Sequence, residues 1–483
     1  MTTLPRLARP LAACLGLAVL AGACATNPVT GEREISLMSE QQEIAIGRQN
    51  DEQIRQEMGV YDDPGLQEYV AGIGAKLARV SHRPDLPWHF TVVDTPAINA
   101  FALPGGFIYI TRGILPYLGD EAQLAGVLGH EIGHVTARHA AQQYTRATGG
   151  SLGLAALGIF VPEARPFGDL ASTGLGLLFL KYGRDDELQA DKLGVQYAAE
   201  GGWDPMGVPT FLATLARIDS MSERGVPNFL STHPDPGSRV ADARPIAEKF
   251  ASASATTTNE AGYERQIDGI IVGDNPKEGV VRGSAFLHPV LRFKLRFPDG
   301  WDVQNSPTQV VAQQPDSNRY MLLQVVEQPQ GHTLEEVATR SMAGANFRRL
   351  QGRLTKINGL DAYVGLYAGQ LEGLGAVGMR AAHIAMGDSV YMLGGFAPEA
   401  EFQAADRVIA PAVESFERMS AAEAEGIHPN RLDFYVARQG DTWESVAERA
   451  GGGATPARLA IMNGYAPGQP PRTGQRLRIV VPG

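Results

Sequence analysis

The stretch His130-Glu131-Ile132-Gly133-His134 constrains this chain of 483 residues more than any other feature. Positions i and i+4 of a helix project from nearly the same face, one turn apart. Two imidazoles placed in this way can share one zinc ion, and Glu131 lies beside them as a candidate general base. The motif therefore predicts a helix, a metal site and hydrolytic chemistry. It is incomplete without a third protein ligand, which catalytic zinc usually has.

The composition is that of a folded protein with several domains. Hydrophobic residues make up 44% and charged residues 20% of the chain, which is typical of globular proteins. The chain is too long for one ordinary core, so about two to four domains are expected. The formal charge of −11 argues against nucleic acid as a partner, because binding to phosphates requires a basic surface.

The N-terminus has the pattern of a signal peptide over residues 1–23. Arg6 and Arg9 supply its positive part, and residues 11–20 form an apolar run that is too short for a convincing membrane span. Small residues then precede Cys24, which resembles a bacterial lipoprotein signal in which the cysteine becomes the lipidated first residue. Ordinary signal cleavage that leaves Cys24 free is the alternative.

Cysteine usage agrees with export and lipidation. The sequence contains only Cys14 and Cys24, so a disulfide framework is excluded and the metal site must use histidine and carboxylate ligands. After residue 24 no apolar run reaches the roughly 18 residues of a spanning helix. The apolar pieces 151–161 and 170–180 are expected in the core, or alternatively in a loop over the active site or at the membrane.

Periodicity and turn signals divide the chain into helices and strands. The metal-binding helix is expected to begin after the N-cap Asp120 and to run to about Tyr144. The other elements expected in the first half are helical segments over 39–80, strands at 90–93, 98–103 and 107–111, and helices near 185–195, 209–220 and 239–250. In the second half, strands are expected at 293–297, 320–326 and 389–393, and helices near 334–342 and 399–418.

The third metal ligand does not come from the motif's own helix in the pattern H-E-x-x-H-x-x-G-x-x-H. The chain has Ala137 and Ala140 at the later positions of that pattern. His139 follows His134 by five residues. It would therefore lie about 140° away around a continuous helix, so a surface or packing role is expected.

A carboxylate from a downstream helix can complete the site. Glu187 and Asp191 lie one turn apart on one helix face. Glu187 can bind zinc while Asp191 accepts the free N–H of a ligating histidine, which fixes its tautomer and orientation. The alternative is a solvated helix start, because acidic residues favour a helix N-terminus. Periodicity leaves both possibilities open.

Four motifs follow one another along the first half of the chain. They are Asn99-Ala100-Phe101-Ala102-Leu103-Pro104-Gly105-Gly106, the histidine motif, Tyr182-Gly183-Arg184-Asp185-Asp186-Glu187-Leu188-Gln189-Ala190-Asp191, and Ser231-Thr232-His233-Pro234. Together they resemble the family of membrane-associated zinc metallopeptidases that includes the CAAX prenyl endopeptidase and the periplasmic β-barrel-assembly-enhancing protease. The resemblance implies one Zn²⁺ per chain, held by His130, His134 and Glu187, with Glu131 as the general base.

The resemblance extends to substrate and transition-state contacts. Asn99-Ala100-Phe101 resembles the edge strand that pairs with an extended substrate. His233 resembles a loop histidine that occupies the water position in a latched state or helps to stabilise the transition state; a turn residue beside proline is the alternative. His233, Arg239 or Tyr182 would support the developing oxyanion, and the sequence does not choose among them. The lack of several transmembrane segments points to the periplasmic lipoprotein branch.

The end of the chain resembles a LysM module. The segments Tyr435-Val436-Ala437-Arg438-Gln439-Gly440-Asp441-Thr442-Trp443, Leu459-Ala460-Ile461-Met462-Asn463-Gly464 and Thr473-Gly474-Gln475-Arg476-Leu477-Arg478-Ile479 carry this resemblance. It implies a βααβ fold that binds N-acetylglucosamine-containing glycan, which in a bacterial envelope means peptidoglycan. The expected glycan contacts are Asp441, Thr442 and Asn463.

These features predict a multidomain α+β chain. The expected parts are a signal peptide (1–23), a mainly helical metallopeptidase domain of the zincin type, gluzincin subclass, with a small sheet (24–250), a connecting segment (251–285), an α+β domain (286–425) and a LysM-like domain (433–483). The expected function is a zinc endopeptidase that is anchored through a lipid at Cys24 on the periplasmic side of the outer membrane and cleaves unfolded or misassembled envelope proteins. A chaperone-like assembly factor with a zinc site latched by His233 is one alternative, and a peptidoglycan hydrolase is another.

Overall fold

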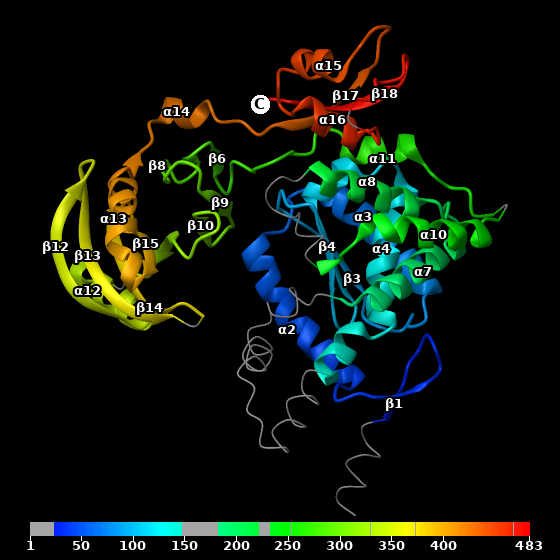
Figure 1. Cartoon of the computed structure of the whole chain (residues 1–483), viewed down its shortest axis with the longest axis horizontal. Helices are drawn as coiled ribbons and strands as arrows, with labels where there is room; N and C mark the ends of the chain where they lie inside the picture. Colours follow the sequence, from blue (N-terminus) through cyan, green and yellow to red (C-terminus); the bar gives the residue numbers. More distant parts are fainter. Residues whose placement is uncertain are drawn as a thin grey trace, which may run out of the picture. The chain divides into compact units, whose positions relative to one another are not determined.

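The computed structural model describes residues 24–146, 182–221 and 232–483, apart from residues 253, 329, 372 and 467 (Figure 1). The predictions for residues 1–23, 151–161 and 170–180 fall outside these ranges. The chain divides into two compact units. The first comprises the described parts of Met1–Arg55, Gly59–Ile270 and Leu432–Val481, and the second comprises Gln56–Met58, Ile271–Arg431 and Pro482–Gly483. Both units mix helices and strands, so the expected multidomain organisation with mixed structure is confirmed.

The first unit opens with a short strand pair and two helices. Strand β1 (Cys24–Thr26) pairs with β2 (Arg33–Ile35) in antiparallel fashion. The helical pattern over 39–80 is two helices, α2 (Glu40–Met58) and α3 (Pro64–Val80). Gly59 ends the first helix, and the side chain of Asp63 caps the second with Pro64 in its first turn.

A three-stranded sheet lies beside these helices, in the order β3-β5-β4. Strand β5 (Phe107–Thr111) is central, parallel to β3 (His89–Val93) and antiparallel to β4 (Ala100–Leu103). The turn at Pro104-Gly105-Gly106 is confirmed. Gly105 has a φ of 82°, and a Cβ there would lie 2.5 Å from Cα of Ile44, so only glycine fits. This order leaves β4 at an edge of the sheet.

The motif helix α4 (Glu121–Thr136) packs against other helices and against strands β4 and β5. The side chain of Asp120 accepts a hydrogen bond from N–H of Gln123, which confirms the expected N-cap. The short η1 helix (Arg112–Tyr117) precedes it, and α7 (Arg184–Glu200), α8 (Gly207–Met221) and α10 (Pro236–Phe250) follow in the sequence. Helices α4 and α7 approach closely because glycines face each other. A Cβ on Gly129 would lie 3.1 Å from the carbonyl oxygen of Gly194, and one on Gly194 would lie 2.9 Å from N of His130.

The expectation that the motif helix runs to about Tyr144 is wrong. Helix α4 ends at Thr136, and Arg138 takes a left-handed backbone conformation with a φ of 60°. The chain is helical again from residue 139 to 146. A left-handed residue cannot continue a right-handed helix, so the second segment leaves in a new direction.

The remainder of the first unit contains the C-terminal module. Strands β17 (Arg431–Val436) and β18 (Arg476–Val481) pair around α15 (Trp443–Arg449) and α16 (Pro456–Met462), which confirms the expected strand-helix-helix-strand order. Within the expected connecting segment 251–285, the structure has helix α11 (Glu260–Ile267) and strand β6 (Val280–Arg282). Tyr263 of α11 is buried, and its hydroxyl donates to the carbonyl of Leu115 at 2.8 Å.

The second unit is built on a seven-stranded antiparallel sheet in the order β12-β13-β14-β15-β11-β10-β9. Its strands are β9 (Asp302–Asn305), β10 (Gln309–Gln313), β11 (Tyr320–Val326), β12 (Phe347–Ile357), β13 (Leu360–Leu371), β14 (Gly375–Met386) and β15 (Ser389–Pro398). Buried residues of α12 (Leu334–Gly344) and α13 (Glu399–Glu414) belong to its two hydrophobic cores. A smaller sheet contains β6, β7 (Ala285–His288), β8 (Phe293–Arg296) and β16 (Glu417–Arg418), and the short helix α14 (Ala421–Glu425) follows.

Candidate metal centre

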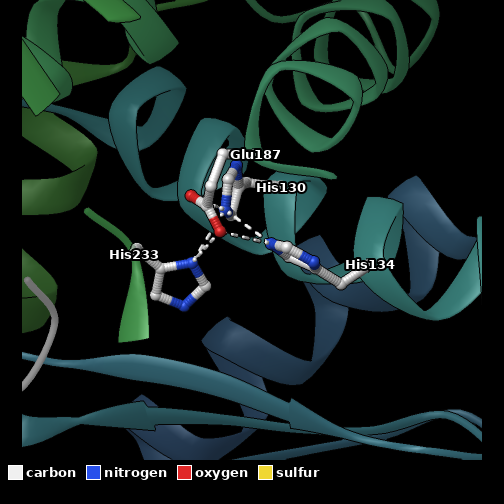
Figure 2. Close-up of side chains that lie close together, drawn as sticks. All are labelled: His130, His134, Glu187 and His233. Atoms are coloured by element: carbon white, nitrogen blue, oxygen red, sulfur yellow. Dashed lines mark hydrogen bonds and ion pairs between the residues drawn. The ribbon is translucent and has the colours of Figure 1, made fainter. Parts of the chain in front are cut away.

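Four buried side chains converge between α4, α7 and the start of α10. They are His130, His134, Glu187 and His233, and one potential ligand atom from each lies within 4.8 Å of the others. Figure 2 shows the two motif histidines and His233 directed toward the carboxylate of Glu187. The sequence left the place of Glu187 open, and the structure brings its side chain to the histidine motif.

The distances within this cluster are short. The Nε2 atoms of His130 and His134 are 3.0 Å apart, and they lie 3.6 Å and 3.4 Å from the carboxylate oxygens of Glu187. Nδ1 of His233 lies 2.9 Å from Oε1 of Glu187. It also lies 3.3 Å from Nε2 of His130. The chain thus gathers three imidazoles and one carboxylate around a single point.

Asp191 is the second partner of His130. Its Oδ1 lies 2.9 Å from Nδ1 of His130, while Nε and Nη2 of Arg239 donate to the same carboxylate at 2.8 Å and 2.7 Å. Nη1 of Arg239 lies 2.6 Å from Oε2 of Glu187. Because a carboxylate can only accept, the proton of neutral His130 resides on Nδ1, and its Nε2 lone pair faces the cluster.

Histidine 139 is a part of the site that sequence reasoning missed. His139 is 1% exposed, and its Nδ1 lies 2.9 Å from Nδ1 of His134. The expected angular separation assumed an unbroken helix, whereas the left-handed Arg138 turns the chain back toward the motif. Positive φ at a non-glycine residue has no reliable sequence signal, so periodicity could not have found this contact.

Glu131 is fully buried beside the cluster. Neither of its carboxylate oxygens has a hydrogen-bond partner within residues 24–146, 182–221 and 232–483. Nε2 of His233 lies 3.6 Å from its Oε1. Burial raises the pKa of Glu131, although the nearby His233 and His130 oppose this shift. A buried carboxylate without hydrogen bonds is costly, which is a feature of functional rather than structural groups.

Burial and neighbouring charges shift the pKa values of the side chains in this cluster. Burial alone would raise the pKa of Glu187, but His233 and Arg239 hold it well below its usual range. The pKa of Asp191 is likewise lowered by Arg239 against the effect of burial. Burial lowers the pKa of His134 well below its usual value. The site therefore favours neutral His134 and ionised Glu187, which are the forms that bind metals.

The residues present fit a divalent metal such as zinc. Two imidazole nitrogens and one carboxylate oxygen form a donor set that is common in catalytic zinc sites. In the tautomers that turn a lone pair of each of these atoms toward the cluster, a cation between them would offset their mutual repulsion. The buried carboxylate of Glu131 lies beside this donor set, 3.6 Å from Nε2 of His233.

Other candidate residues lie around this cluster. A small cavity is lined by Ala102, Leu103, His134 and Tyr182, so the end of the β4 edge strand adjoins the motif histidine. Ala100 begins the same strand, Asn99 lies directly before it, and the buried Phe101 stacks on Tyr109. The ring of Tyr182 stacks on His134 with centroids 3.9 Å apart.

The candidate glycan-binding residues have bonds within their own module. Asp441 accepts from the Tyr435 hydroxyl and the Arg438 N–H. Thr442 caps α15. The Asn463 amide donates to the carbonyls of Leu459 and Arg478. These side chains are thus engaged in bonds that hold the loop before α15 and the loop after α16.

Comparisons with known proteins agree with these observations. Residues 64–247 match peptidase family M48, and residues 435–480 match the LysM domain. The chain is 35% identical over 235 residues to the beta-barrel assembly-enhancing protease of Escherichia coli (strain K12), a match that covers 47% of this chain and 48% of that protein. It is 34% identical over 180 residues to the mitochondrial metalloendopeptidase OMA1 of Arabidopsis thaliana, covering 36% of this chain and 35% of that protein. The chain thus spans about half, or less, of the length of these relatives.

Among solved structures, cyanobacterial PsbP from Synechocystis sp. PCC 6803 aligns with 29% of this chain over 95% of its own length, with 14% sequence identity and a TM-score of 0.24. Within the described ranges, no helix combines the length and apolarity needed to cross a bilayer. The resemblance carried by the four motifs and by the C-terminal segments is confirmed. The segment 64–247 of this chain belongs to peptidase family M48, and the segment 435–480 is a LysM domain.

Proposed function

We propose that this protein is a zinc-dependent endopeptidase. The observation that carries the proposal is the convergence of His130, His134 and Glu187 beside the buried carboxylate of Glu131, which accepts no hydrogen bond from the described part of the chain. This combination favours hydrolysis over a structural role, since a structural zinc site needs no adjacent carboxylate base. Membership of segment 64–247 in peptidase family M48 supports peptide bonds as the substrate class.

The roles of the residues follow from their placement. His130, His134 and Glu187 would hold the metal, with Asp191 fixing the tautomer of His130. A zinc ion held by these residues would supply a Lewis acid, which lowers the pKa of an attacking water and polarises a carbonyl. Glu131 takes the proton from that water and later delivers it to the leaving amine nitrogen. The raised pKa of Glu131 suits both steps, because a group that takes and then returns a proton works best when its pKa is closer to the operating pH.

An extended substrate would bind along β4. Strand β4 (Ala100–Leu103), an edge strand among the described residues, offers backbone N–H and C=O groups to a peptide strand, and its end adjoins His134. Tyr182 stacks on His134, so we favour Tyr182 over Arg239 as the residue that supports the oxyanion. Three nitrogens of Arg239 already face Asp191 and Glu187, so its role would be to hold those carboxylates.

A latched form is favoured by the position of His233. Its Nδ1 lies 2.9 Å from Glu187 and 3.3 Å from His130, within the ligand cluster itself. In this arrangement His233 would take the position that a catalytic site leaves open for water, and the protein would act as a chaperone-like assembly factor until the loop moves. The His233→Ala variant separates the two roles. A latch predicts faster proteolysis by the variant, and transition-state stabilisation by His233 predicts slower proteolysis.

The place of action is proposed from the two ends of the chain. The N-terminal pattern before Cys24 supports a lipid anchor on the periplasmic side of the outer membrane, and the LysM domain supports attachment to peptidoglycan. The similarity to a protease named for β-barrel assembly supports unfolded or misassembled envelope proteins as substrates. Retention of the full chain on purified peptidoglycan, and its release by N-acetylglucosamine oligomers, tests the glycan contact.

Cleavage of casein tests the enzymatic proposal. The purified chain should cleave casein, a metal chelator should stop the reaction, and added Zn²⁺ should restore it. Suppression of substrate aggregation without any cleavage would support the chaperone-like alternative. Release of soluble muropeptides from peptidoglycan without casein cleavage would instead support a glycan-directed hydrolase.

A further inference from the structure

The break after helix α4 brings a second imidazole onto the motif. His139 follows the left-handed Arg138 and returns its ring to His134, with their Nδ1 atoms 2.9 Å apart and the rings edge to face. On its other side, Nε2 of His139 lies 2.9 Å from Oε1 of Gln189 on α7. His139 therefore bridges the motif helix and the helix that carries Glu187.

Only one arrangement of protons satisfies these contacts once His134 presents a lone pair to the cluster. Nε2 of His134 lies 3.4 Å from a carboxylate oxygen of Glu187 and 3.0 Å from Nε2 of His130. A neutral imidazole that binds metal through Nε2 carries its proton on Nδ1. His134 must then donate from Nδ1, and Nδ1 of His139 must accept. His139 consequently carries its proton on Nε2 and donates it to the amide oxygen of Gln189.

A buried ionic network holds the chain break in place. Nε of Arg138 lies 2.6 Å from Oε1 of Glu43, and its Nη2 donates to the carbonyl of Met38 at 2.6 Å. Nη1 of Arg83 donates to the other oxygen of Glu43 at 2.8 Å and to the carbonyl of Val135 at 3.0 Å. These contacts tie the left-handed residue to α2, so the position of His139 is fixed from outside the site.

We propose that His139 is a positioning residue of the metal centre, the neutral acceptor that fixes the tautomer and the ring orientation of His134. This inference rests on the proposed role of His134 as a metal ligand. For His130 the corresponding acceptor is a carboxylate, that of Asp191. A neutral partner on His134 adds no further negative charge to a buried site that already contains Glu131, Glu187 and Asp191.

Replacing His139 with asparagine or leucine gives a matched test, because the two side chains have the same branched shape and only asparagine offers an acceptor. Zinc dissociation constants are measured by competition with a chromogenic chelator, and the visible spectrum of the Co²⁺ form reports the ligand geometry. His139→Leu should weaken zinc binding by about 10- to 100-fold and alter the Co²⁺ spectrum. His139→Asn should stay within a few-fold of the native protein and keep its spectrum.

The outcomes separate this inference from the proposed function. If both variants bind zinc as tightly as the native chain, or if both lose affinity equally with an unchanged circular dichroism spectrum, His139 has a packing role and the inference is overturned. If the native chain itself binds no zinc, the proposed function fails before His139 is tested. The unfolding midpoint of the apo form of each variant shows whether a loss of zinc reflects a loss of fold.

Discussion

The Nδ1 atom of His130 lies 2.9 Å from Oδ1 of Asp191, and Arg239 donates to both oxygens of the same carboxylate. One helix turn separates Asp191 from Glu187, so α7 supplies both a potential ligand and the group that orients another. The whole arrangement is buried, which makes each of its hydrogen bonds costly to lose.

Asp191→Asn should weaken zinc binding by about 10- to 100-fold, because the amide loses the charge that pairs with Arg239 and strengthens the basicity of His130. Chelator competition measures the change. Asp242→Asn, on exposed surface of α10, is the matched control and should bind zinc normally. Native affinity in Asp191→Asn would show that the carboxylate only supports the fold.

Glu187→Ala should abolish stoichiometric zinc binding, since two imidazoles alone do not form a stable catalytic site. Elemental analysis of the purified protein gives the metal content. Asp185→Ala removes an exposed acid from the first turn of the same helix and should retain zinc. Full retention of metal by Glu187→Ala would mean that another residue, His233 being the nearest, completes the site.

Gly194→Ala should destabilise the fold by about 1–3 kcal/mol, because its Cβ would meet backbone atoms of His130 that cannot move aside. The predicted separation is 2.9 Å from N and 3.2 Å from Cα of His130. Gly72 lies in an exposed position of α3 with open space around it. Gly72→Ala should therefore stabilise the fold by about 0.5–1 kcal/mol instead of destabilising it. Urea unfolding midpoints measure both changes, and equal effects of the two substitutions would contradict this account of the helix contact.

Cys24→Ala should release the protein from the membrane fraction of cells, because the thiol that would carry the lipid is lost. Cys14→Ala, within the expected signal peptide, is the control and should leave the protein membrane-bound. Fractionation followed by immunoblotting measures the distribution. An unchanged membrane association of Cys24→Ala would reject the lipid anchor.

Sequence patterns predicted the elements whose signals are local. The N-cap Asp120, the glycine turn before Phe107 and the strand-helix-helix-strand order of the last module all depend on neighbours in the chain. Strands β12 to β14 were not predicted. Strand β12 is exposed on both faces along most of its length, so it lacks the alternation of apolar and polar residues that identifies a strand.

The site was predictable where spacing within a helix decides it. His130, Glu131 and His134 follow from one motif, whereas Glu187 needed a resemblance, because its distance from the motif depends on the close contact between Gly129 and Gly194. His139 was missed because Arg138 adopts its left-handed conformation through contacts with Glu43 and Met38, far away in the sequence. Tertiary contacts of this kind leave no periodic pattern.

The most direct test of the central claim compares zinc content and casein cleavage in the native chain and in Glu131→Gln. The amide keeps the size of Glu131 but cannot accept a proton from water. Both proteins should contain one zinc ion per chain, and the variant should lose roughly two to four orders of magnitude in rate. Near-normal proteolysis by Glu131→Gln, or a native protein that cleaves casein without zinc, would contradict the assignment of this cluster as a zinc peptidase site.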